Sequence, residues 1–313
     1  MLPLFVCPML CIFNPEHDLC LANGNRHYVP PTSALEFASQ CCGIMGSLYP
    51  DALSLPASVA GDALHNPERY GFGRDVADSI VPWGWNAALK QLLLKQGFPE
   101  ALMPSDDTLS RWRRLQHRST LLPLQPDSRA VTSVEEVVGL VGQYGSVVMK
   151  APWSGSGRGL RWVTEGLSGH DEAWLAKMVC EQQCVIVEPR RHVADDFALE
   201  YRIDNDGLHF IGFSLFESAN GVYQGNILLS DDAIRRRVGF STAEQDSLES
   251  WLASHIVPFY QGPLGVDCLL DADGRCHISE LNLRHTMGHV AHAYLALHPE
   301  AQGTLFSPTV RKS

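Results

Sequence analysis

Apolar and polar residues alternate in the first third of the chain as they do where strands and helices follow one another. The apolar run at residues 4–13 predicts a buried strand, and residues 79–81 predict a second, short strand. Helical spacing of apolar residues occurs at 33–45 and 85–96. This alternation favours an α/β domain with a mainly parallel sheet. The turn signal Pro104-Ser105-Asp106-Asp107 gives the first domain border.

The remaining two thirds predict a mixed arrangement of short strands and helices. The expected helices lie at 133–144, 171–182, 242–256 and 285–297. The expected strands lie at 147–150, 160–163, 184–187, 197–204, 208–216 and 222–229, followed by a hairpin over 263–282.

Composition narrows the class of protein. Of 313 residues, 45% are hydrophobic and 19% are charged, which excludes a disordered or fibrous chain. Lys and Arg number 24 against 35 Asp and Glu, and the formal charge of −11 argues against a broad nucleic-acid-binding surface. No stretch approaches the ~20 apolar residues of a membrane span.

The cysteines and the start of the chain are typical of a cytoplasmic protein. The 9 cysteines include no C-x-x-C pair, which is typical of reduced, mostly buried thiols in a cytoplasmic protein. The apolar N-terminal run has no positive segment and no small-residue cleavage site. We therefore interpret it as a buried strand and not as a signal peptide.

A Gly-rich loop follows the strand at 147–150. Lys150 ends that strand, and Ser154-Gly155-Ser156-Gly157-Arg158-Gly159 precedes the next one. Glycines let backbone N–H groups approach phosphate oxygens, and the lysine adds a positive charge, so the loop is a candidate phosphate-binding site. Neither the G-x-x-x-x-G-K-[ST] nor the G-x-G-x-x-G spacing is present. The alternative is a flexible hairpin loop with a lysine at a strand end.

The hairpin at 263–282 places acidic residues opposite one another. Taking Asp273-Gly274 as a two-residue turn pairs Asp267 with Glu280. Because side chains alternate with period two, Asn282 shares the face of Glu280 and lies across from Gly265. Leu269 and Ile278 are expected on the same face.

Two carboxylates that face each other destabilise a sheet unless a cation lies between them. Oxygen atoms of Asp, Glu and Asn are the ligands that Mg²⁺ accepts, with its other positions left for water and phosphate. Asp267, Glu280 and Asn282 are therefore candidate magnesium ligands. The alternative is that both carboxylates are solvated on an open sheet face.

The order of these features resembles the ATP-grasp superfamily of ATP-dependent ligases over residues 110–290. The shared pattern consists of Lys150, the Gly-rich loop, an apolar strand ending in Glu188-Pro189, Asp267, Glu280-Leu281-Asn282 and Arg284. The resemblance implies an ATP-grasp architecture that is α/β at its N-terminus and α+β in its ATP-binding half. The implied parts are an N-terminal α/β domain (1–104), a central lid subdomain (105–189) and a C-terminal antiparallel-sheet domain that binds metal and ATP (190–313).

The resemblance also implies roles in a nucleotide site. Lys150 would bind the α- and β-phosphates, and residues 154–159 would cover the β- and γ-phosphates. Glu188 and its neighbours would form the hinge that binds adenine. Asp196 would reach the ribose, with Asp195 as the alternative.

The same resemblance implies a metal site and a reacting centre. Asp267, Glu280 and Asn282 would hold Mg²⁺, with Mn²⁺ as a possible substitute. Arg284 would face the transferred phosphoryl group or the acyl intermediate. Arg118 stands where the family has an earlier phosphate-binding lysine, a change that keeps the charge and alters the geometry.

The implied reaction joins a small-molecule carboxylate to an amine. ATP would activate the carboxylate as an acylphosphate, which the amine then attacks. We expect no nucleic-acid or membrane partner, and the sequence is compatible with a homodimer. A non-catalytic ATP-binding or sensor protein with the same fold is the alternative.

A polar segment after the first strand is a candidate substrate site. Glu16, Asp18 and Asn23 follow that strand at the carboxyl end of the predicted sheet, where α/β proteins place ligands. Helix capping and turn formation explain the same residue types equally well.

Three histidines suggest a different kind of site. His285, His289 and His292 have i, i+4 and i+7 spacing in a predicted helix, which would place them on one face as ligands of a transition metal. The H-E-x-x-H motif is absent. Ordinary histidines on a helix face are the competing interpretation.

Overall fold

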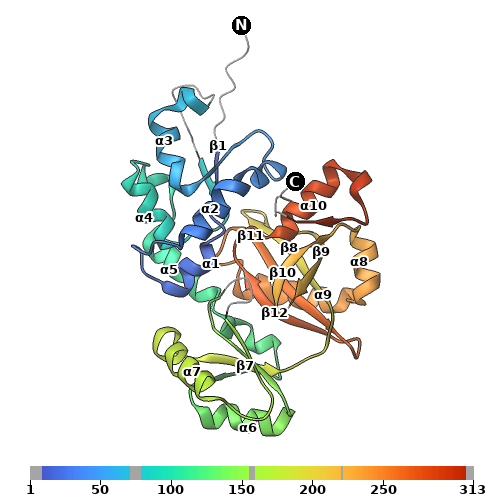
Figure 1. Cartoon of the computed structure of the whole chain (residues 1–313). Helices are drawn as coiled ribbons and strands as arrows, with labels where there is room; N and C mark the ends of the chain where they lie inside the picture. Colours follow the sequence, from blue (N-terminus) through green and yellow to red (C-terminus); the bar gives the residue numbers. More distant parts are fainter. Residues whose placement is uncertain (1–8, 71–78, 155–158, 220, 308–313) are drawn as a thin grey trace.

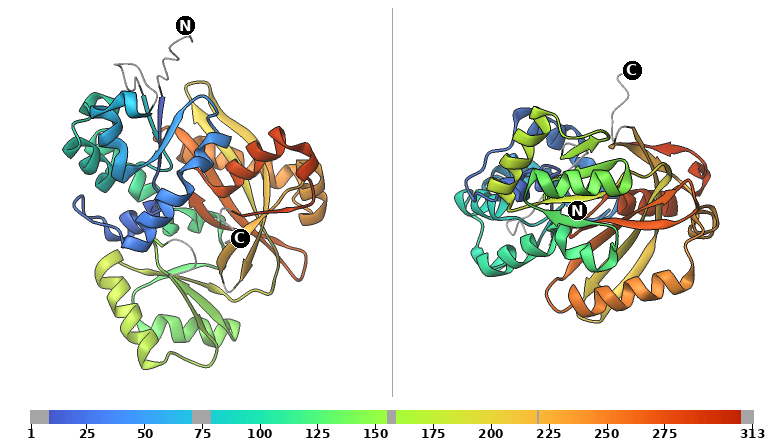
Figure 2. Two further views of the ribbon diagram at one scale, coloured as in Figure 1. Left: turned by 45° about the horizontal axis from the view of Figure 1, so that its top comes forward. Right: turned by 90° about the horizontal axis from the view of Figure 1, so that it is seen from below.

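The strands described in the computed structural model form three sheets (Figure 1). The described residues are 9–70, 79–154, 159–219 and 221–307. Figure 1 and the left view of Figure 2 show the second sheet and its two helices as a separate lower part, while the first and third sheets lie side by side above it. The predicted domain ranges follow this order, and their borders stay predictions.

The first sheet is parallel, as the alternating pattern predicts. Its strand order is β2-β1-β3, formed by Leu53–Pro56, Met9–Phe13 and Ser79–Pro82. The helices of this part are α1 (His17–Asn23), α2 (Thr32–Cys41), α3 (Ala60–His65) and α4 (Ala87–Lys95), with a 3₁₀ segment η1 (Cys42–Ser47) after α2. Leu10, Ile12 and Leu93 are fully buried in its core, so β1 is a buried strand as the apolar run predicts. Residues 4–8 of that run lie outside the described residues.

The second sheet is antiparallel, with the order β4-β7-β5-β6. Its strands are Arg129–Val131, Val185–Pro189, Val147–Lys150 and Leu160–Val163. Helices α6 (Val134–Tyr144) and α7 (Gly169–Gln182) pack on it and bury Val137 and Leu175. Both helices begin with a capping box, at Ser133 and Ser168.

The third sheet has six strands in the order β12-β11-β8-β9-β10-β13. The bounds are Cys276–Asn282, Gly262–Asp271, Val193–Asp204, Gly207–Ala219, Val222–Ile227 and Leu305–Phe306. Its helices are α8 (Asp231–Val238), α9 (Thr242–His255) and α10 (Met287–Leu297). On β8 the odd positions, such as Phe197 and Tyr201, enter the core, so the even positions face the other side of the sheet.

A connecting segment joins these parts. Helix α5 (Asp106–Leu115) is capped by Ser105 and is tied to α4 by the buried Lys90, whose Nζ lies 2.9 Å from Asp106. The 3₁₀ segment η5 (Arg118–Leu124) then packs against β12, and its Leu121 belongs to the core of the third sheet.

The acidic hairpin has the predicted pairing but not the predicted turn. Asp271 N donates to Arg275 O, which makes the turn three residues long with Gly274 at φ 78°. A bulge then adds Ser279 to β12, and this extra residue restores the pairing of Asp267 with Glu280. The prediction for Ile278 is wrong, because the bulge turns that side chain into the core.

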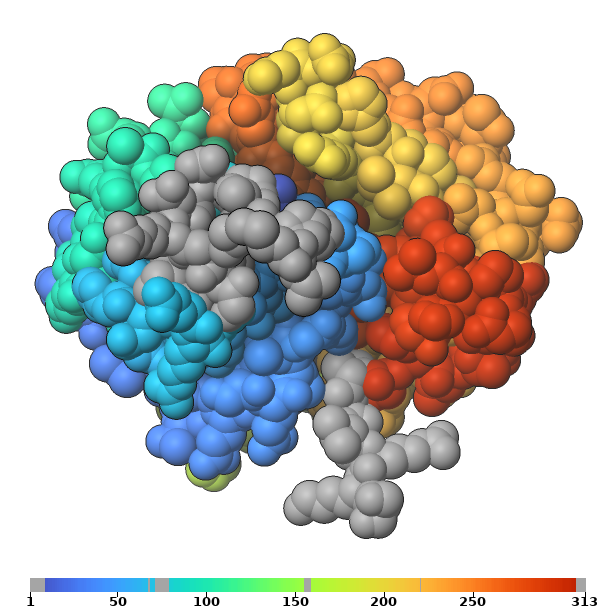
Figure 3. Space-filling view, turned by 90° about the horizontal axis from the view of Figure 1, so that it is seen from above, coloured from blue at the N-terminus to red at the C-terminus, as the bar shows by residue number. Residues whose placement is uncertain are grey.

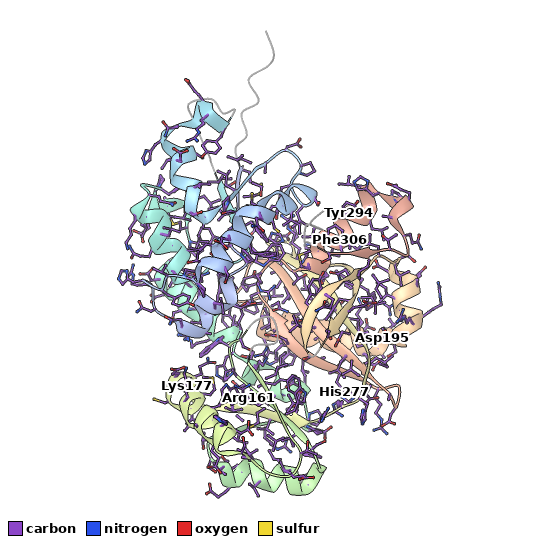
Figure 4. The ribbon with its side chains drawn as sticks, viewed as in Figure 1. Arg161, Lys177, Asp195, His277, Tyr294 and Phe306 are labelled. Atoms are coloured by element: carbon purple, nitrogen blue, oxygen red, sulfur yellow. The ribbon has the colours of Figure 1, made fainter. Side chains whose placement is uncertain are left out.

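Strand β13 closes the outer edge of the third sheet. It pairs with β10, and Phe306 packs its ring 4.8 Å from that of Tyr294 on α10, next to each other in Figure 4. Among the described residues, no helix is long and apolar enough to cross a membrane.

Candidate active site

A cavity of about 870 Å³ lies where the three parts meet, and most of the predicted site residues line it. Strands β5 to β7 form one side, and strands β8 to β12 form the floor. Residues of the first part close the far end. The volume is within the range of small-molecule sites.

Lys150 lies at the side of the cavity formed by the second sheet. Its ammonium group forms an ion pair with Glu188 on the neighbouring strand β7 and donates to Ser279 Oγ at 3.3 Å. Both partners also line the cavity. The bulge in β12 therefore brings Ser279 to the lysine, a residue that the sequence analysis missed because a bulge leaves no clear signal in the residue pattern.

Arg118 connects the base of the Gly-rich loop to the acidic hairpin. Its guanidinium donates to Ala151 O and, at 2.7 Å, to Ser154 Oγ. A second nitrogen lies 2.7 Å from Glu280 Oε2. The residue is buried, so these contacts are shielded from solvent.

The Gly-rich loop is described only at its two ends. Ser154 lines the cavity, and the backbone of Gly159 accepts from Ala151 N at 2.8 Å. A Cβ atom on Gly159 would lie 2.4 Å from the Ser154 side chain, so a glycine is required there. Gly155, Ser156, Gly157 and Arg158 lie outside the described residues.

Asp267, Glu280 and Asn282 meet on the cavity floor. Burial and the negative charges of Glu280 and Glu200 raise the pKa of Asp267 to about 8. The side chain of Asn282 hydrogen-bonds to Asp267, and it faces Gly265 as the pairing predicts.

This trio fits a hard divalent cation. Two carboxylates and an amide side chain share the cavity floor there, and the negative charges of Glu280 and Glu200 add to burial in raising the pKa of Asp267. Within the described ranges, no group of three or more His, Cys, Asp or Glu side chains is arranged to hold a metal ion. The amide of Asn282 is therefore an essential member of the candidate set.

Glu200 is a cavity residue that the sequence analysis missed. It is 1% exposed and accepts hydrogen bonds from Ser214 Oγ at 2.9 Å and Thr286 Oγ1 at 2.8 Å. His289 Nδ1 lies 3.0 Å from its second oxygen. The signal was the alternation on β8, which places Glu200 on the same face as Asp196.

Gly288 at the start of α10 leaves room for Glu200. A Cβ atom there would lie 1.8 Å from Glu200 Oε1, so Gly288→Ala is expected to destabilise the fold by about 1–3 kcal/mol. Gly139→Ala on α6 is the matched control, since nothing lies within 4 Å of its Cβ position and alanine favours a helix. Urea unfolding measures both variants, and equal stabilisation of the two would contradict the tight fit.

Asp196, and not Asp195, reaches the cavity. Asp196 accepts a hydrogen bond from Ser218, and burial raises its pKa. Asp195 instead forms a bidentate pair with Arg237, at 2.6 and 3.1 Å, on α8. Figure 4 shows Asp195 at the outer side of the third sheet.

Arg284 and Asp18 form an ion pair across the far end of the cavity. Nε and one terminal nitrogen of Arg284 donate to the two oxygens of Asp18, at 3.0 and 2.8 Å. Burial by itself raises the pKa of Asp18, but Arg284 holds it below its ordinary value. Both residues line the cavity, so the predicted positions meet although 266 residues separate them.

Two other predicted substrate residues do not line the cavity. Glu16 is buried, and its Oε2 atom has no hydrogen-bond partner. Asn23 is exposed at the end of α1 and accepts from Asn25 N at 3.2 Å, as a turn-forming asparagine does. Their assignment to the substrate site is therefore corrected.

Glu16 makes stability depend on pH. Burial raises its pKa from 4.5 to about 7, so the folded state binds the extra proton, and stability falls as the pH rises from about 4.5 through 7. Glu16→Gln is expected to remove this loss, which is at most about 3 kcal/mol. Urea unfolding at pH 5 and pH 8.5 measures it, and parallel pH profiles for both proteins would contradict the assignment.

The three histidines do not converge on one point. Helix α10 begins at Met287 with Thr286 as its N-cap, so His285 lies outside the helix and contacts Tyr49 Oη at 3.2 Å. His289 contacts Glu200, while His292 lies 3.7 Å from Asp231. The predicted histidine metal site is therefore wrong.

Comparisons with known proteins identify the fold. No family model and no curated protein matches the sequence. Biotin carboxylase from Campylobacter jejuni, solved as a β-γ-ATP complex, is similar with a TM-score of 0.54 at 14% identity, over 96% of this chain and 72% of that chain. The chain has the ATP-grasp fold.

Two further solved structures share this fold. The Aspergillus clavatus N5-carboxyaminoimidazole synthase, in complex with ADP and 5-aminoimidazole ribonucleotide, has a TM-score of 0.51 at 12% identity, over 90% of this chain and 71% of that chain. Pyruvate carboxylase from Rhizobium etli has a TM-score of 0.51 at 19% identity, over 76% of this chain and 21% of that chain.

Proposed function

We propose that this protein is an ATP-dependent ligase that activates a carboxylate as an acylphosphate and joins it to an amine. One observation carries the proposal: three cations, Lys150, Arg118 and Arg284, and the Asp267–Glu280–Asn282 trio line or border the same cavity in an ATP-grasp fold. Phosphoryl transfer requires mainly positioning and neutralisation of charge, which these groups supply.

The nucleotide would occupy the side of the cavity between the second and third sheets. Lys150 would bind the α- and β-phosphates, and residues 154–159 would cover the β- and γ-phosphates. Glu188 and Pro189 would hold the adenine, and Asp196 the ribose. The lining supports this placement, because it includes the half-exposed Trp162 and Leu160 of β6, which offer an apolar surface to a base.

The metal would lie at the acidic hairpin. Asp267, Glu280 and Asn282 would hold Mg²⁺, which when bound neutralises charge on the phosphate oxygens. Arg118 bonds Glu280 and Ser154, so it orients the carboxylate and the start of the phosphate loop together.

The reacting centre would lie beside Arg284. An oxygen of the substrate carboxylate attacks the γ-phosphorus, and the bond from that phosphorus to ADP breaks. The amine nitrogen then attacks the acyl carbon, phosphate leaves, and the proton of the amine passes to phosphate. Of the five N–H groups of Arg284, three are used on Asp18 and His285 O, which leaves two for the substrate carboxylate.

The test is formation of ADP from Mg²⁺ and ATP in the presence of a carboxylic acid and hydroxylamine. A ligase of this type is expected to give equal amounts of ADP and hydroxamate, and neither without the acid. ADP formation that does not depend on any acid would contradict the proposal.

A further inference from the structure

The far end of the cavity has a composition that the proposed ligase reaction does not by itself explain. We define the acceptor end as the wall formed by Pro15, Asp18, Phe37, Trp83, Arg284 and Met287. These residues come from the first part of the chain and from the start of α10. Figure 3 shows the blue N-terminal segments next to the red C-terminal ones on the upper face.

The acceptor end is a continuous wall. His285 N donates to Trp83 O at 2.8 Å, which ties the segment before α10 to the end of β3. Trp83 lies in a core cluster with Phe37 and Met287 packed against it. The Arg284–Asp18 ion pair holds the same two parts together beside this cluster.

The apolar part of this wall is open to the cavity. Phe37 and Met287 are half-buried, and each lines the cavity together with the more deeply buried Trp83. Apolar ligand atoms placed against such side chains leave water and are bound more tightly. A polar or charged group in the same place would lose its hydration without a partner.

The charged part of the wall carries one cation, Arg284. Arg284 is the one cation among the described residues that form the acceptor end, and most of its charge is already balanced by Asp18. Two of its five N–H groups are left to donate to a substrate carboxylate. A phosphate ester or a second carboxylate would meet no further cation at this wall.

We propose that the substrate activated by this protein is a carboxylic acid with an apolar side chain, bound through its carboxylate at Arg284 and through its side chain against Phe37, Trp83 and Met287. This inference rests on the proposed ligase function and specifies its first substrate. Each methylene group in contact with such a wall changes specificity by about 10-fold or more.

The experiment compares acids of matched shape in the ADP and hydroxamate assay. The pairs are leucine with asparagine and 4-methylpentanoate with succinamate, and 3-phosphoglycerate serves as a phosphorylated acid. The apolar member of an active pair is expected to have a kcat/KM at least about 10-fold higher than its polar partner. Preference for the polar members or for 3-phosphoglycerate would overturn the inference.

Variants of the wall provide the second measurement. Phe37→Asn and Met287→Gln are each expected to reduce the apolar preference by about 10-fold while the KM for ATP stays unchanged. Phe259→Asn is the matched control, because this phenylalanine is 45% exposed and does not line the cavity. An unchanged preference in both wall variants would overturn the inference.

The two proposals fail in different ways. If Mg²⁺ and ATP raise the unfolding temperature but none of these acids yields ADP, the proposed substrate class is wrong and the nucleotide site remains. If the nucleotide does not raise the unfolding temperature, the proposed function fails, and the inference that rests on it fails as well.

Discussion

Glu280→Gln is expected to lower the rate of ADP formation by at least about 100-fold. Glutamine keeps the shape of the side chain but removes the charge that would hold Mg²⁺, and it weakens the 2.7 Å contact with Arg118. Replacing a group that only supports a metal ligand already lowers metal affinity or activity by about 10–100-fold. Loss of a ligand itself is therefore expected to cost at least as much. Steady-state kinetics over a range of Mg²⁺ concentrations measures the effect.

A variant in the same hairpin separates this effect from damage to the fold. Asp273→Asn changes an exposed acid in the turn, away from the cavity, and is expected to leave turnover unchanged. Turnover close to normal in Glu280→Gln would refute the proposed metal site.

Lys150→Met is expected to lower kcat/KM for ATP by about 100–1000-fold. The lysine is the cation at the end of β5, just before the Gly-rich loop, and a preorganised donor to a reacting group contributes that much to the transition state. Methionine retains the length of the side chain, so packing changes little. Kinetics at varied ATP concentration, with the substrate acid saturating, measures the loss.

Lys90→Met is the matched control for Lys150→Met. Lys90 is equally buried and paired with Glu100 and Asp106, but it lies outside the cavity. It is expected to reduce stability without changing the KM for ATP. If both lysine variants lose activity to the same extent, the role of Lys150 is structural.

Counting back from a two-residue turn at Asp273-Gly274 predicted the pairing of Asp267 with Glu280, although that turn is wrong. The third turn residue shifts the register by one position, and the bulge at Ser279 shifts it back. The predicted pairing is therefore correct because these two shifts cancel. The pattern of residue types does not show where a bulge adds a residue to a strand. The contact of Ser279 with Lys150 could therefore not be predicted.

Contacts between distant segments were beyond prediction from the sequence. The Arg284–Asp18 pair joins positions separated by 266 residues, and Arg118 reaches Glu280 from a 3₁₀ segment that no apolar pattern indicates. Glu200 could have been predicted as a cavity residue, because the alternation on β8 places it on the same face as Asp196. Its hydrogen bond with Thr286, the N-cap of α10, depends on how α10 packs on the sheet.

The most direct test of the central claim is thermal unfolding with and without Mg²⁺ and ATP, because it needs no second substrate. At about 100 times the Kd, binding contributes about 2.7 kcal/mol, which raises the unfolding temperature by several degrees. We expect this rise for the wild-type protein only when Mg²⁺ is present, and a much smaller one for Lys150→Met. No rise at millimolar Mg²⁺ and ATP would contradict the claim that the cavity is an ATP site.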